Sequence, residues 1–172
     1  MNAITIREEQ ADDRAAVYEV EKRAFGRAAE ADLVEQLRAH GKVTLSLVAL
    51  EAGQVVGHVL FSPARIESPA GCVPVQGMAP VAVLPQRQGQ GVGSALVRAG
   101  LERLRQDGHM LVIVEGNPRY YTRFGFVDSL PLGISCEFNP PPGCFMVQAL
   151  RPGALSGVSG ISYYAEEFQA VG

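Results

Sequence analysis

The sequence is short of cysteine, of charged residues and of net positive charge, and each shortage excludes a class of protein. The three cysteines show no Cys-x-x-Cys or comparable spacing, so we expect no metal site and a reducing compartment. Charged residues make up 19% of the chain, and 15 Lys+Arg against 18 Asp+Glu give a net charge of −3. The chain therefore lacks the basic field that nucleic-acid binding requires. Its 47% hydrophobic residues argue against disorder.

Long apolar runs are also missing. The longest uncharged tract, residues 68–86, is broken by four prolines, so it predicts no membrane-spanning helix. The N-terminal residues turn polar at Arg7, which excludes a signal peptide. We therefore expect a cytoplasmic protein with no membrane partner. The length of 172 residues indicates a single domain over residues 1–172.

Glycine and proline, by contrast, are plentiful, with 19 and 11 residues. Ten of these 30 residues fall between residues 129 and 160, so we expect that stretch to be irregular. The others mark turns, or places where the backbone approaches a ligand closely.

The hydrophobic pattern predicts a mixed α/β fold. The expected strands are residues 3–8, 43–50, 55–66, 72–84, 111–114, a short strand after residue 126 and a last strand over 144–150, and the expected helices are residues 13–25, 28–40, 92–107 and 118–124. Residues 72–114 indicate a parallel strand–helix–strand crossover, and the rest indicates antiparallel hairpins. We therefore expect a mostly antiparallel sheet flanked by helices. Pro80 lacks a backbone donor, which predicts a bulge or a separation from the neighbouring strand.

Gly89, Gly91 and Gly93 lie between an expected strand and the start of an expected helix. Backbone N–H groups are unsatisfied at a helix start, and the helix dipole adds positive character there. Without side chains in the way, an anion can approach several N–H groups at once. No Asp or Glu occurs in the 34 residues 68–101, whereas Arg87 and Arg98 do. The pattern therefore indicates an anion site.

Three other interpretations of this turn compete with an anion site. A Walker-type loop requires a lysine where the helix opens, and the sequence has Gly93-Ser94-Ala95 instead. A dinucleotide-binding unit is nearly matched by Gly89-x-Gly91-x-x-Ser94 with Glu115 closing the next strand. However, the residues after Glu115 do not continue with alternating strands and helices. The third interpretation is a turn that binds no ligand, and the sequence does not exclude it. Three alternate glycines weaken a helix start, however, so their presence requires a reason.

Two blocks of the sequence resemble a known family. Gln88-x-x-Gly91-x-Gly93 matches the Gln/Arg-x-x-Gly-x-Gly/Ala signature of the GCN5-related N-acetyltransferases (GNAT), and residues 81–96 are similar to that family's strand, turn and helix. Residues 115–127, EGNPRYYTRFGFV, resemble the family's tyrosine followed four residues later by Gly-Phe. This block is nearest to a bacterial subgroup of predicted acetyltransferases. The order of expected elements fits the family's fold, so the resemblance covers most of the chain.

The resemblance implies the acyl-CoA N-acyltransferase fold and acetyl-CoA as the donor. In that family the strand before the turn pairs with the pantetheine arm, and the amides of the turn hold the pyrophosphate. The cofactor-binding residues that it implies are Val81, Ala82, Val83, Gln88, Gly89, Gln90, Gly91, Val92, Gly93, Ser94, Asn117 and Tyr120. Asn117 departs from the Asp that is more common in the subgroup.

Acetyl transfer to an amine requires a base, donors for the oxyanion and an acid for the departing thiolate. The resemblance assigns the acid to Tyr121 and the oxyanion donor to a backbone N–H near Val81 or Ala82. No carboxylate lies on the strand before the turn, so the candidates for the base are Glu115, Glu67 and His58. We expect direct transfer of the acetyl group to a primary amine. A regulatory module that binds coenzyme A without turnover is the alternative.

Residues 161–168 hold several aromatic side chains. We expect this segment to dock on the body of the protein, over an acceptor cleft or at a dimer interface. The sequence carries no signature of the acceptor. The expected partner is a small-molecule or peptide amine, and the expected assembly is a monomer or homodimer.

Overall fold

The structure is a computed structural model that describes residues 3–171, so the ends of the expected domain, residues 1, 2 and 172, lie outside the described residues. The strands are β1 (Ile4–Glu8), β2 (Leu45–Glu51), β3 (Gln54–Ser68), β4 (Gly71–Val83), β5 (Leu111–Glu115), β6 (Val127–Asp128), β7 (Ile134–Cys136), β8 (Phe145–Ala149) and β9 (Gly160–Tyr163). The helices are α1 (Arg14–Phe25), α2 (Ala29–Ala39), α3 (Val92–Gln106) and α4 (Pro118–Tyr121), and a terminal 3₁₀ helix, η5, spans Glu166–Ala170.

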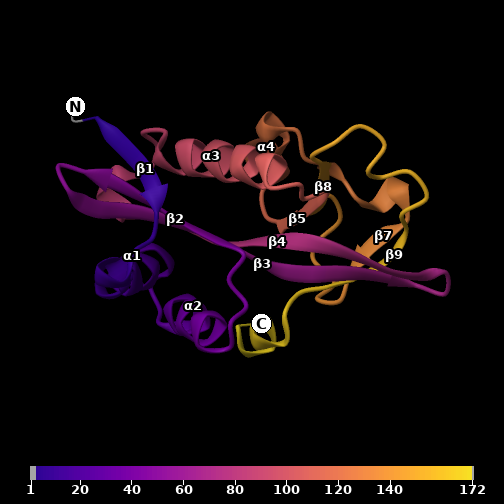
Figure 1. Cartoon of the computed structure of the whole chain (residues 1–172), viewed down its shortest axis with the longest axis horizontal. Helices are drawn as coiled ribbons and strands as arrows, with labels where there is room; N and C mark the ends of the chain where they lie inside the picture. Colours follow the sequence, from indigo (N-terminus) through magenta and orange to yellow (C-terminus); the bar gives the residue numbers. More distant parts are fainter. Residues whose placement is uncertain (1–2, 172) are drawn as a thin grey trace.

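Within residues 3–171 the strands form one nine-stranded sheet, in the order β1-β2-β3-β4-β5-β8-β6, with β9 on β3 and β7 on β9. Only the pairs β4–β5 and β7–β9 are parallel among these strands, so the expected fold class, mostly antiparallel and flanked by helices, is confirmed. Helices α1 and α2 cover one face of the sheet and α3 covers the other (Figure 1). Each face buries its own apolar core. No helix among the described residues is both long and apolar enough to span a bilayer.

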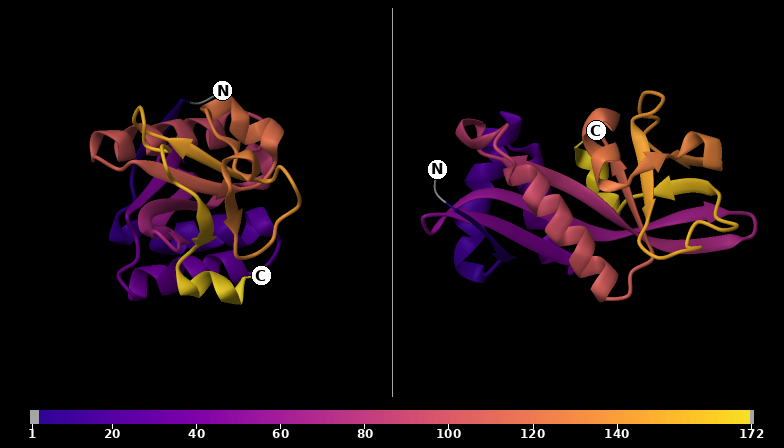
Figure 2. Two further views of the ribbon diagram at one scale, coloured as in Figure 1. Left: turned by 90° about the vertical axis from the view of Figure 1, so that its right-hand side faces the viewer. Right: turned by 90° about the horizontal axis from the view of Figure 1, so that it is seen from above.

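Helix α3 lies close to the sheet because its inner face combines apolar and small residues. Leu96 and Leu104 are fully buried, and Gly100 faces the ring of Phe61. A Cβ at Gly100 would come within 2.4 Å of that ring, so only glycine permits this approach. Figure 2 shows α3 crossing the strands obliquely in the view from above. Its N-terminus is thereby fixed beside the end of β4.

The sheet splits between β4 and β5. These strands pair only at Gln76 with Val112 and at Gly77 with Ile113. Just beyond, the register of β4 on β3 shifts between Met78 and Val81, which is a bulge at Ala79 and Pro80. The irregularity expected at Pro80 is confirmed. Beyond Gly77, β4 has no strand partner on its β5 side among the described residues.

Two expectations for the C-terminal third were wrong. Residues 144–150 were expected to form the last strand, but β9 follows β8. Residues 129–160 were expected to be irregular, but β7 lies among them. Both missed strands are only three or four residues long and are held by distant partners, because β9 pairs with the outer part of β3 and β7 pairs with β9. Such pairing leaves little periodic signal in the sequence.

The terminal aromatic segment docks on the body, as expected. Tyr164 and Phe168 are buried, and the segment ends beside α2 (Figure 2). The ring of Tyr164 lies against Gly77, where a Cβ would come within 2.8 Å of it. Gly77 therefore makes room for Tyr164.

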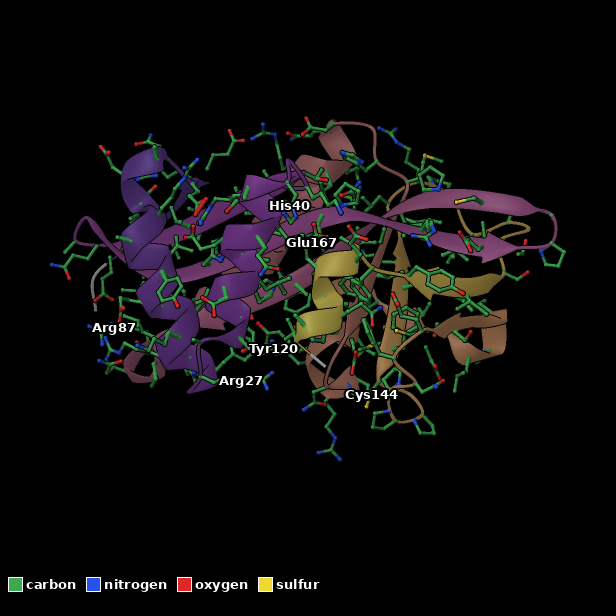
Figure 3. The ribbon with its side chains drawn as sticks, turned by 90° about the horizontal axis from the view of Figure 1, so that it is seen from below. Arg27, His40, Arg87, Tyr120, Cys144 and Glu167 are labelled. Carbon is green, nitrogen blue, oxygen red and sulfur yellow. The ribbon has the colours of Figure 1, made fainter. Side chains whose placement is uncertain are left out.

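A polar contact fixes the same segment to the end of α2. The Nδ1 atom of His40 lies 2.6 Å from Oε2 of Glu167, and Lys42 donates to Oε1 of Glu167 at 2.8 Å. Figure 3 shows Glu167 on the terminal turn next to His40. The Glu167 side chain is almost fully buried, although the segment belongs to the end of the chain.

Candidate active site

The glycine turn borders a cavity of about 590 Å³ at the start of α3. Gly89 and Gly91 have φ angles of 74° and 88°, a backbone region that favours glycine, and Gly91 is the N-cap of α3. Gly93 faces the hydroxyl of Tyr120, which would lie 2.8 Å from a Cβ at that position. The turn therefore keeps its amides accessible to an anion. The residues that line this glycine-side cavity are Val83, Arg87, Gln88, Gly89, Gly91, Gly93, Ser94, Asn117, Arg119, Tyr120 and Arg123.

Residues 68–101 contain no carboxylate, but the fold brings one into contact with them. Glu51, at the end of β2, accepts hydrogen bonds from Arg87 at 2.8 and 2.9 Å, and this contact lowers the pKa of the Glu51 carboxyl. The positive charge of Arg87 is thus largely neutralised by Glu51. Arg119 and Arg123 line the same cavity and were not singled out from the sequence, although they flank the tyrosine pair.

Asn117 has a structural task that the sequence did not reveal. Its Oδ1 accepts a hydrogen bond from the N–H of Arg119 at 2.9 Å and caps α4. Asn and Asp are equally good caps, which explains why either residue suits this position.

Ala82, Gln90 and Val92 were expected to bind the cofactor but do not line the glycine-side cavity. Ala82 and Val92 are buried in the core, and the Gln90 side chain donates to a backbone carbonyl of the preceding turn at 3.2 Å. Any contact that Ala82 and Val92 make with a ligand therefore uses their backbone.

A second cavity, of about 580 Å³, opens where β4 and β5 separate. We call it the apolar cavity, after its lining residues: Phe25, Glu30, Leu33, Met78, Ala79, Pro80, Val81, Glu115, Gly116, Tyr121, Phe138, Tyr164, Phe168 and Val171. Val81 lines this cavity and Val83 lines the glycine-side cavity. In α4, Tyr121 lines the apolar cavity and Tyr120 lines the glycine-side cavity. The two cavities therefore adjoin along β4 and α4.

Tyr121 contributes a phenol to the apolar cavity. Its ring lies against Gly116, where a Cβ would come within 2.5 Å, and packs edge-on against Phe126 with ring centroids 5.9 Å apart. Burial, with a smaller effect of Tyr120, raises the pKa of Tyr121 to about 12. The hydroxyl is therefore protonated at neutral pH and is a hydrogen-bond donor.

Of the three candidates for the base, the structure brings only Glu115 to the apolar cavity. Burial raises the pKa of its carboxyl above the ordinary value, and its side chain forms no ion pair or hydrogen bond with residues 3–171. Glu67 lies on the outer part of β3 and pairs with Arg65 at 2.6 Å. His58 is fully buried, and burial lowers its pKa to about 4. Neither of these two lines either cavity.

Sequence analysis missed much of the apolar cavity. Glu30 lines it and is held by Arg27, whose Nε and Nη2 donate to the carboxylate at 2.9 and 2.5 Å. Helical residues such as Phe25 and Leu33, and residues of the C-terminal segment, complete the wall. No motif marks them, because only the tertiary fold brings them together.

A glycine-rich turn at a helix start, next to a split sheet with a phenol and a carboxylate at the gap, is the arrangement expected of an acyl-CoA-dependent transferase. Residues 5–127 match the family described as "Acetyltransferase (GNAT) domain", and the chain belongs to this family of N-acyltransferases. The family resemblance stated from the sequence is confirmed.

Particular relatives agree with this assignment. The chain is 39% identical over 148 residues to YhbS of Escherichia coli K12, described as an uncharacterized N-acetyltransferase, with 86% of this chain and 87% of YhbS covered. The crystal structure of YhbS in complex with CoA matches with a TM-score of 0.92 and 37% identity over 100% of this chain and 95% of that chain. A GNAT acetyltransferase from Brucella melitensis in complex with acetyl-CoA matches with a TM-score of 0.80 and 35% identity, covering 98% and 99%.

Proposed function

We propose that this chain, acting as one domain over residues 1–172, transfers the acetyl group of acetyl-CoA directly to a primary amine. The observation that carries the proposal is that the glycine-side cavity and the apolar cavity adjoin along β4 and α4. The glycine-side cavity suits the phosphates of the donor, and the apolar cavity offers the carboxylate of Glu115 and the phenol of Tyr121. The relatives from E. coli and B. melitensis, seen with CoA and acetyl-CoA, support the choice of donor.

The residues of the glycine-side cavity fit the donor. Acetyl-CoA supplies, when bound, an acetyl group activated as a thioester. The amides of residues 88–94 suit its pyrophosphate, and the guanidinium groups of Arg119 and Arg123 add positive charge. The N–H of Leu84 donates to β3, so strand alternation turns the N–H groups of Val81 and Val83 toward the gap beside β5. Val81 is therefore the better placed of the two proposed oxyanion donors.

Glu115 takes the proton from the amine. Glu115 is exposed at a largely apolar cavity and has no side-chain partner among the described residues, so its carboxylate attracts an ammonium group. The raised pKa makes Glu115 a stronger base than an ordinary carboxylate. The proton passes to Glu115 directly or through a water molecule, and the uncharged amine then attacks.

Tyr121 assists the departing thiolate. Its pKa of about 12 keeps the hydroxyl protonated. Complete transfer of its proton to a thiolate, whose ordinary pKa is about 8.5, is unfavourable. The larger part of its role is therefore a hydrogen bond that stabilises the negative sulfur as the C–S bond breaks.

The test is release of free thiol from acetyl-CoA in the presence of a panel of primary amines, with mass spectrometry of the acceptor. We expect thiol release above the buffer rate and acetylation of at least one amine. Binding of coenzyme A without thiol release for any amine in the panel would favour the regulatory module instead.

A further inference from the structure

The walls of the apolar cavity are mostly hydrocarbon. They come from four separate parts of the chain: the first two helices, the bulge of β4, the strand–helix region around α4, and the C-terminal third. Phe25 and Leu33 contribute from α1 and α2, and Phe138, Tyr164 and Phe168 contribute aromatic rings from the other side. A ligand that fills this space loses water from an apolar surface, which stabilises an apolar body and not a polar one.

The charge in the cavity has one sign. No Lys, Arg or His is among its lining residues. Of the two carboxylates, Glu30 is already neutralised by the two hydrogen bonds from Arg27. Glu115 alone has no side-chain partner among the described residues. The cavity thus offers a place for one positive group and none for a negative group.

The C-terminal segment closes one side of the cavity. Phe168 and Val171 form part of the wall, and Glu167 fixes their segment through His40 and Lys42. The backbone carbonyl of Val171 also accepts a hydrogen bond from Arg27 at 3.4 Å. The volume of about 580 Å³ must also accommodate the acetyl end of the donor, because Val81 and Tyr121 line the same cavity. Only part of it is left for the acceptor.

We propose that the acceptor is a small primary amine whose remaining body is uncharged and apolar, such as an aromatic ring on a short alkyl chain. This inference rests on the proposed function and specifies its substrate class. Glu115 takes one proton from the ammonium group, and the uncharged nitrogen forms a C–N bond with the acetyl carbon. The C–S bond breaks, the sulfur leaves as a thiolate that Tyr121 stabilises, and the second proton of the nitrogen passes to the thiolate or to solvent. An acceptor with its own carboxylate beside the amine is repelled by Glu115.

The experiment compares three acceptors that share one ring: 2-phenylethylamine, phenylalanine and phenylalanine amide. The first has no further group, the second adds a carboxylate and the third adds an uncharged amide. Thiol release should give a kcat/KM for 2-phenylethylamine at least about thirtyfold above that for phenylalanine, with the amide in between. Calorimetric titration of 2-phenylethylamine into the protein, with and without CoA, gives a readout that does not depend on turnover.

The outcomes separate this inference from the proposed function. If phenylalanine, 1,4-diaminobutane or a lysine peptide is acetylated as well as 2-phenylethylamine, the substrate class is wrong while the proposed function stands. If 2-phenylethylamine binds but no amine is acetylated, the proposed activity is wrong while the preference of the cavity stands. If 2-phenylethylamine neither binds nor reacts, the inference is overturned.

A matched pair of variants tests whether the cavity wall selects the body of the acceptor. Phe25 is 42% exposed and lines the cavity, so its truncation should leave the fold intact. Phe25→Ala should raise KM for 2-phenylethylamine about tenfold and leave KM for ethylamine, which has no ring, within twofold. Met110 is 45% exposed and lies outside the cavity, so Met110→Ala should change neither value. An unchanged KM for 2-phenylethylamine in Phe25→Ala would overturn the proposed binding mode.

Discussion

Tyr120 and Tyr121 are neighbours in α4, yet their rings stand at 87° to each other and line different cavities. The hydroxyl of Tyr120 covers Gly93, and the guanidinium of Arg123 lies 4.7 Å from the centre of the Tyr120 ring. The Tyr121 ring faces the split in the sheet. We therefore expect the two tyrosines to affect different steps. Tyr120 lines the glycine-side cavity and should affect cofactor binding, whereas Tyr121 lines the apolar cavity and should affect acetyl transfer.

Replacing Tyr121 by phenylalanine removes one hydroxyl and little volume. We expect Tyr121→Phe to lower kcat at least tenfold, because the departing sulfur loses its hydrogen-bond donor. The dissociation constant for CoA, measured by calorimetry, should stay within twofold. Tyr120→Phe is the control, and its effect should fall on CoA binding and not on kcat. A fully active Tyr121→Phe variant would contradict the role assigned to this phenol.

The same substitution, glycine to glutamate, at the two ends of α3 tests whether the glycine turn binds CoA. Gly91→Glu places a carboxylate where we propose that the pyrophosphate binds and strains a backbone with φ of 88°. We expect it to abolish measurable CoA binding in calorimetry. Gly108, beyond the other end of α3, has φ of 90° and open space around it, so Gly108→Glu carries the same strain away from the cavity. Loss of binding in both variants would attribute the effect to folding, and retained binding in Gly91→Glu would refute the phosphate site.

The pH dependence of kcat/KM reports on Glu115. A base works in its deprotonated form, so the rate should rise as the pH increases through the pKa of Glu115, which burial places above the ordinary carboxyl value. A second rise belongs to the amine and should move when an amine of different pKa is used. Glu115→Gln should remove the first rise and lower kcat/KM about a hundredfold. If the low-pH rise persists in Glu115→Gln, another group is the base.

Local signals explain why much of this site was predictable. The glycines of the turn, the period of α3 and the bulge near Pro80 each depend on residues close in sequence. The position of the turn at the start of α3 therefore followed from the residues themselves, whereas its binding of the pyrophosphate stays a prediction.

Contacts between distant residues explain what was not predictable. Arg87 was expected to serve an anion, but Glu51 comes from β2, 36 residues earlier, and pairs with it. Glu30, brought into the apolar cavity by α2, carries no motif. The short strands β7 and β9 have too few residues for a period and exist because the long hairpin of β3 and β4 offers a free edge.

The terminal segment should respond to acid through Glu167. Its pKa is lowered to about 2, because hydrogen bonds from Lys42 and His40 outweigh the opposing effect of burial. The stabilisation is therefore complete above about pH 5, near the unfolded value, and is lost as the pH falls toward 2. Glu167→Gln should lower the free energy of unfolding by about 1–3 kcal/mol at pH 7 and flatten this dependence. Glu166→Gln is the control, since that side chain is 86% exposed and should change stability by less than about 0.5 kcal/mol. Equal effects of the two variants would contradict the contact.

Gly77 and Tyr164 lie 87 residues apart in the sequence and are in contact in the fold. In Gly77→Ala the new Cβ would stand 2.8 Å from the tyrosine ring, so either the ring or the strand must move. We expect chemical denaturation to show a loss of about 1–3 kcal/mol, the usual cost of overpacking. In a Tyr164→Leu background the smaller side chain leaves room, and the same alanine should cost less than about 0.5 kcal/mol. The two effects would add if the ring did not lie on Gly77. In that case the position of Tyr164 in the wall of the apolar cavity would also be wrong. The double-mutant cycle therefore also tests the cavity shape from which the class of acceptor is inferred.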